Sequence, residues 1–142
     1  MFFEHICIAT DGSDVAYRAA QMAMVLARSG AGRVLALSVA QALDADRDAG
    51  QASASGHVAK VARLAHAAGV ACDSMTAAAS SPGPEIVRVA EENGCDLIVM
   101  GTHGVNEMNR DIAGSVAQYV LAHAAVPVLV LRDPREAAPP EA

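Results

Sequence analysis

Residues 96–104 read DLIVMGTHG, a short apolar run that ends in a glycine-bearing turn. Four further apolar runs occur along the chain, and segments with apolar residues at helical spacing separate them. Runs that are apolar on both faces fit a parallel sheet covered by helices on both sides, so the pattern predicts an α/β fold with the element order β-α-β-α-β-α-β-α-β. The predicted strands span residues 5–9, 34–39, 70–75, 96–100 and 127–131, and the third is expected at an edge.

Four helices are predicted between these strands. The first starts after Ser13 or Asp11, either of which can cap it by accepting backbone N–H bonds, and it stops near Gly30. Residues 41–55 are rich in Ala, Asp, Gly and Ser and are predicted to form a loop. The remaining helices are predicted over residues 58–68, 84–93 and 114–124.

Composition limits the classes of function. With 53% hydrophobic residues the chain can bury a core, whereas 3% aromatic residues leave no stacking surface for a nucleic-acid strand. The net charge of -6 gives no general attraction to nucleic acid or to anionic membranes. One domain is predicted over residues 1–132, followed by a disordered tail over the proline-bearing residues 133–142.

Cysteine usage and the first residues bear on the compartment. Cys7, Cys72 and Cys95 are widely spaced and form no CxxC motif, which favours a reducing compartment. The opening residues lack the basic and long apolar segments of a signal peptide, and no apolar stretch is long enough to span a membrane. A cytoplasmic protein is the resulting expectation.

Two predicted strands end in polar, glycine-bearing turns. The first ends in ATDGS at residues 9–13, and the fourth ends in MGTHG at residues 100–104. Ligands of open parallel sheets bind outside the carboxyl ends of the strands, where the strand order reverses. The spacing G-x2-G-x9-G-S then leads from the fourth strand to Gly114 and Ser115, which open a predicted helix. Glycine backbones and a helix N-terminus can bind phosphate; the alternative is that the glycines form a tight turn and Ser115 caps its helix.

These motifs resemble the universal stress protein family. The likeness rests on DLIVMGTHG, on its spacing to GSVAQYVL, on the ending VPVLVLR and on the opening ICIATDGSDVAYRAAQMA, and it covers residues 3–132. The resemblance implies an open doubly wound five-stranded parallel sheet in the order 3-2-1-4-5, with helices on both faces. That order places the reversal between the first and fourth strands, the two with polar exits.

The resemblance also implies an adenine-nucleotide site, with ATP as the expected ligand. Residues at the positions of Asp11 and Val39 face the adenine and ribose, and those after the fourth strand line the ribose and phosphates. The start of the last helix holds the phosphates. His103 either contacts a phosphate or is a solvent-facing loop residue. The full expected site is Ala9, Thr10, Asp11, Val39, Met100, Gly101, His103, Gly104, Gly114, Ser115 and Val116.

The segment after Gly104 departs from the family pattern. Where members often carry a basic residue, a Ser and a Gly, this chain has Val105, Asn106 and Glu107. Asp111 adds a second carboxylate. A carboxylate about 4 Å from a phosphate charge costs on the order of 4 kcal/mol at a surface-like dielectric, before salt screening. Either these carboxylates point outward, or a divalent cation such as Mg²⁺ lies between them and the ligand, or nucleotide binding is weak.

Together with this resemblance, the sequence leads us to expect a small regulatory protein of the stress response that binds ATP and associates with a second copy. An apolar edge strand leaves backbone groups unpaired, so a homodimer is expected through the last strand, Val126 to Leu131. The alternative is a dimeric interaction protein of the same fold with little or no nucleotide affinity.

No catalytic residue and no metal ligand are predicted. The chain lacks the P-loop and GxSxG motifs, so an enzyme is not expected, and slow ATP hydrolysis is the remaining catalytic alternative. Four scattered histidines are predicted to be surface or helix-end residues, namely His5, His57, His66 and His123.

Overall fold

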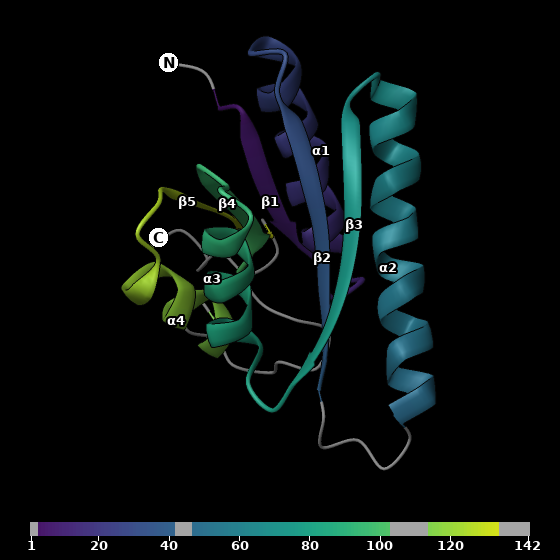
Figure 1. Cartoon of the computed structure of the whole chain (residues 1–142), viewed down its shortest axis with the longest axis vertical. Coiled ribbons are helices and arrows are strands. Elements are labelled where there is room, and N and C mark those ends of the chain that lie inside the picture. The colour runs from purple at the N-terminus through teal and green to yellow at the C-terminus, as the bar shows by residue number, and fades with distance from the viewer. Residues whose placement is uncertain (1–2, 42–46, 103–113, 134–142) are drawn as a thin grey trace, which may run out of the picture.

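Five parallel strands form one sheet in the order β3-β2-β1-β4-β5, which confirms the expected fold class and strand order. The computed structural model describes residues 3–41, 47–102 and 114–133 (Figure 1). Along the chain the elements are β1 (His5–Ala9), α1 (Asp14–Ser29), β2 (Arg33–Gln41), α2 (Arg47–Ala68), β3 (Ala71–Ala79), α3 (Pro82–Glu92), β4 (Leu97–Gly101), α4 (Ser115–His123) and β5 (Val128–Leu131).

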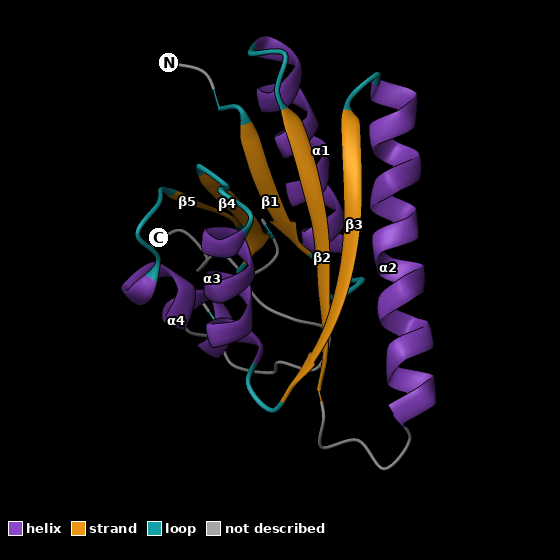
Figure 2. Ribbon diagram, viewed as in Figure 1, coloured by secondary structure: helices purple, strands orange, loops and turns teal. Residues whose placement is uncertain are grey.

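Helices cover both faces of the sheet, and alternate strand residues enter two separate cores. In β1, Ile6 and Ile8 pack with α1 and α2, whereas Cys7 and Ala9 pack with α3 and α4. Figures 1 and 2 show the two pairs of helices on opposite sides of the sheet. This burial on both faces explains why the central strands are unbroken apolar runs in the sequence.

Small residues and a serine cap place α1 on the sheet. Of the two predicted caps, Ser13 bonds the helix, because its Oγ accepts from the backbone N–H of Ala16 at 3.2 Å. The Asp11 carboxylate accepts instead from the Ser13 N–H at 3.0 Å. A row of fully buried alanines lets the helix approach the strands closely: Ala19, Ala20, Ala23 and Ala27.

The predicted loop over residues 41–55 is wrong from Arg47 onward, because α2 begins there (Figure 2). Glycines at positions 50 and 56 each lower helix propensity by about 1 kcal/mol relative to Ala, which hides the helix from a pattern search. Packing overrides this local preference, since Ala54 is buried at 2% exposure. The helix runs to Ala68, and Gly69 with φ of 72° follows it.

Smaller differences lie at the ends of elements. β3 extends to Ala79 and pairs with β2 alone, which confirms its predicted edge position. α3 starts at Pro82, slightly before its predicted start. Asp133, the first residue of the tail predicted over residues 133–142, is buried. Residues 134–142 lie outside the described part of the chain.

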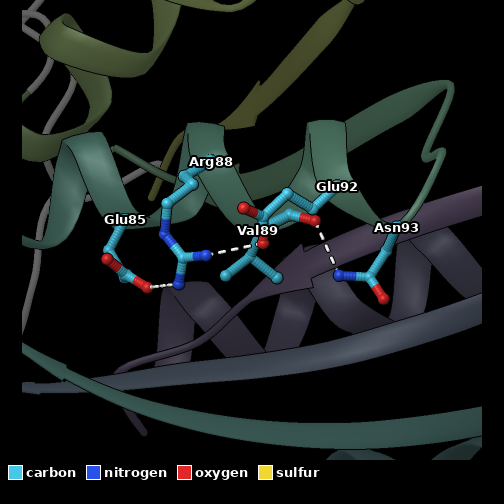
Figure 3. Close-up of polar contacts among 5 residues, drawn as sticks. All are labelled: Glu85, Arg88, Val89, Glu92 and Asn93. Atoms are coloured by element: carbon cyan, nitrogen blue, oxygen red, sulfur yellow. Dashed lines mark hydrogen bonds and ion pairs between the residues drawn. The ribbon is translucent and has the colours of Figure 1, made fainter.

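The outer face of α3 carries a cluster of charges. Arg88 pairs with Glu85 and Glu92 (Figure 3), and these carboxylates raise the pKa of Arg88 above its ordinary value. The Asn93 side chain donates to the backbone carbonyl of Val89 at 2.8 Å at the end of the helix. Because Arg88 is exposed, these ion pairs add little stability. The inner face of α3 instead packs against the core on that side of the sheet.

Candidate functional site

A cavity of about 390 Å³ lies at the carboxyl ends of β1, β2 and β4. One part of its lining, which we call the glycine wall, comes from the exits of β1 and β4 and the start of α4: Ala9, Thr10, Asp11, Met100, Gly101, Thr102, Val116 and Ala117. Another part, which we call the α2 wall, comes from the end of β2 and the first turns of α2: Ser38, Val39, Ala40, Gln41, Gly50, Ser53, Ala54 and His57.

Most of the predicted site residues meet at this cavity. Those that line it are Ala9, Thr10, Asp11, Val39, Met100, Gly101 and Val116. Gly114 and Ser115 do not line it themselves, but they directly precede Val116 at the start of α4. His103 and Gly104 lie outside the described residues, as do the carboxylates Glu107 and Asp111.

The turn after β1 is held by its own side chains. The Gly12 N–H donates to Thr10 Oγ1 at 3.2 Å, and the Ser13 N–H donates to Asp11 Oδ1 at 3.0 Å. Gly12 has φ of 83°, a conformation that side chains rarely adopt. The exposed Asp11 carboxylate is thereby fixed beside the cavity by the backbone that follows it.

Gly101 lets the end of β4 lie against the start of α1. A Cβ built on Gly101 would be 2.8 Å from Cγ1 of Val15 and 3.3 Å from the backbone nitrogen of Ala16. Gly101 therefore has a packing role as well as a place in the cavity lining. The glycine motif can be explained by phosphate binding or by a structural role. The close contact with Val15 supports a structural role at Gly101.

The first turn of α4 lines part of the cavity. Gly114 is its N-cap residue, so Ser115 is the first helical residue rather than the cap. The Gly114 N–H donates to the Thr102 carbonyl at 2.6 Å, which joins the helix start to the β4 exit. Gly114 has no side chain with which to cap the helix, and Val116 and Ala117 of the first turn line the cavity. Such a helix end favours an anion.

The sequence prediction missed the contribution of α2. His57, predicted to be a surface or helix-end residue, lines the cavity, and its Nδ1 lies 3.3 Å from Oγ of the buried Ser38. A signal exists in the sequence, because positions 50, 53, 54 and 57 share one face of a helix. The prediction of a loop over residues 41–55 hides this pattern, because a loop has no helical face.

The cavity has little formal charge of its own. Within the described residues, Asp11 is the one carboxylate in its lining, and no Lys or Arg lines it. The same part of the chain contains no group of three His, Cys, Asp or Glu side chains that could hold a metal ion.

The thiols of Cys7, Cys72 and Cys95 have pKa values that depart from the ordinary value, and none of the three residues lines the cavity. A hydrogen bond with Cys95, together with burial, raises the pKa of the Cys7 thiol well above its ordinary value. All three cysteines are free. Cys7 therefore behaves as a small apolar residue of the core beneath α3.

Comparisons place these features among known proteins. Residues 2–132 match the universal stress protein family. The chain is similar to Universal stress protein MJ0531 of Methanocaldococcus jannaschii, with 34% identity over an alignment of 149 positions, gaps included, that covers 94% of this chain and 85% of that protein. Within the described residues, no helix has the length and apolar character of a membrane span.

Solved structures share the fold. A universal stress protein family member from Burkholderia pseudomallei has a TM-score of 0.73 and 29% identity, covering 90% of this chain and 95% of that one. The universal stress protein from Archaeoglobus fulgidus in complex with dAMP has a TM-score of 0.75 and 23% identity, covering 92% of this chain and 99% of that one.

Proposed function

This chain belongs to the universal stress protein family, and from that premise we propose that it is a regulatory protein that binds an adenine nucleotide in the cavity described above. The observation that carries the proposal is the start of α4, whose N-cap residue is Gly114 and whose first turn lines a cavity at the β1 and β4 exits. Proteins of the same fold support it, since three solved structures of universal stress proteins contain cAMP, dAMP and AMP, respectively.

ATP is the nucleotide that we propose, with Mg²⁺ as its counter-ion. Phosphates at the start of α4 would meet backbone N–H groups, and the described lining offers no Lys or Arg to offset further charge. A divalent cation would supply that positive charge. It would also offset the negative charges of Glu107 and Asp111, which follow Gly104 in the sequence. Binding in EDTA that equals binding in Mg²⁺ would contradict this part of the proposal.

We propose that the protein acts in the cytoplasm through binding rather than catalysis. In the described lining, Asp11 and His57 are the side chains with acid–base chemistry, and Asp11 is already bonded to its own turn. Phosphate release from ATP at a rate that depends on either residue would contradict the non-enzymatic role.

A steric block tests the site. Val116→Trp places a large side chain at the half-buried cavity position in the first turn of α4. Calorimetry should show a loss of ATP affinity of at least about a hundredfold, because the ring fills the space the ligand needs. Leu121→Trp is the matched control, since Leu121 is exposed on the same helix. A parent protein that binds none of ATP, ADP or AMP would overturn the proposed function.

A second function, association of two copies, is favoured by β5. This apolar strand lies at the sheet edge and its four residues are only half-buried. The Pro127 and Leu131 carbonyls accept from the β4 side, and backbone groups alternate in direction along a parallel strand. The N–H of Val130 therefore points away from β4, where a second β5 strand would pair with it.

We propose that a homodimer forms through residues Val126 to Leu131. Val130→Pro removes the outward N–H and should convert a dimer into a monomer in sedimentation, with circular dichroism confirming that the variant is folded. A parent chain that sediments at 14.5 kDa at tens of micromolar would exclude the dimer.

A further inference from the structure

The α2 wall holds one aromatic side chain, and two neighbours fix its position. Among the described residues that line the cavity, His57 is the only one with an aromatic ring. Its Nδ1 lies 3.3 Å from Ser38 Oγ, and Ser38 is 3% exposed at the end of β2. The imidazole is thus anchored to the sheet although it comes from α2.

Gly12 covers the ring from a second side. A Cβ built on Gly12 would be 2.4 Å from Nε2 and 2.5 Å from Cδ2 of His57, so the imidazole fills the space that a side chain would need. Ser38 and Gly12 together restrict rotation of the ring. His57 itself is half-buried and lines the cavity.

We propose that His57 contacts the nucleotide, with its ring packed against the base. This inference rests on the proposed function, because it requires a nucleotide in the cavity. The start of α4 favours the phosphate at the glycine wall, so the base is directed toward the α2 wall. A purine has a flat apolar face, and a ring already held in place loses little conformational freedom on contact.

This contact makes α2 part of the nucleotide site. The first turns of α2 otherwise reach the sheet through buried Ala54 and through the Gln51 amide, which donates to the Thr76 hydroxyl of β3. A base against His57 adds a further link between this helix and the end of β2.

Calorimetry with adenosine and with AMP tests the contact. His57→Ala should weaken both ligands by the same factor of about tenfold, because both carry the base. His57→Phe keeps a planar ring and should stay within about threefold of the parent. His66→Ala is the matched control, since His66 is an exposed histidine on the same helix. Equal losses in the Ala and Phe variants would overturn packing by the ring.

Nuclear magnetic resonance of the parent protein gives a readout that needs no variant to fold. Adenosine should shift the carbon-bound ring proton signals of His57 through the ring current of the base and leave those of His66 unchanged. A role limited to holding the Gly12 turn would weaken binding without that shift. Adenosine binding with unmoved His57 signals overturns this inference alone, whereas a parent that binds neither adenosine nor AMP overturns the proposed function as well.

Discussion

Two glycines, Gly101 of the glycine wall and Gly56 on the exposed surface of α2, differ in how closely they are packed. A side chain at Gly101 would meet Val15 at 2.8 Å. Gly56 lies outside the cavity lining and has no atom within 4 Å of the place its Cβ would take. The comparison indicates that the exit of β4 leaves no room for a side chain, whereas the outer surface of α2 does.

The largest effect is expected on the glycine wall. Gly101→Val should lower the free energy of unfolding by about 3 kcal/mol, because the added methyl groups overlap Val15 and the backbone of α1. Urea unfolding followed by circular dichroism measures the change. Adding Val15→Ala to this variant should recover part of the loss by removing the methyl groups it meets. A Gly101→Val protein as stable as the parent would show that the wall has room after all.

An intermediate effect is expected at Gly12, which lies against His57 of the α2 wall. Gly12→Ala should cost about 2 kcal/mol of unfolding free energy, since φ of 83° strains an alanine and its Cβ displaces His57. In a His57→Ala background the overlap is gone and about 1 kcal/mol of backbone strain should remain. Equal costs in both backgrounds would show that His57 does not lie against Gly12.

The smallest effect is expected on α2, and with the opposite sign. Gly56→Ala should raise the free energy of unfolding by about 1 kcal/mol, because helix propensity improves and no neighbour is displaced. Gly69→Ala is the matched control: its Cβ also meets open space, but φ of 72° should make the change destabilising. A destabilised Gly56→Ala variant would mean that the helix surface is packed more tightly than its contacts indicate.

The sheet was predictable because its signal is local. Each central strand is buried on both faces and therefore stands out as an apolar run, as residues 97–100 do. The strand order came from the family resemblance, which depends on the glycine spacing around Gly101. The predicted residues on the glycine wall, apart from Val116 of α4, lie at strand exits, so the parallel topology alone brings them together.

The α2 wall could not be predicted in the same way. Its helix contains Gly50 and Gly56 and gains its stability from tertiary contacts, which local propensity does not include. Once the start of the helix was missed, His57 had no defined face. Its distance from Ser38 depends on how α2 lies along β2, and no spacing in the sequence encodes that.

The hydrogen bond between the Thr102 carbonyl and the Gly114 N–H has a consequence for how this protein can be altered. It holds Thr102 and Gly114, the described residues on either side of the span 103–113, next to each other. We therefore expect a change in the length of this span to leave β4 and α4 in place, because Thr102 and Gly114 hold its two ends together.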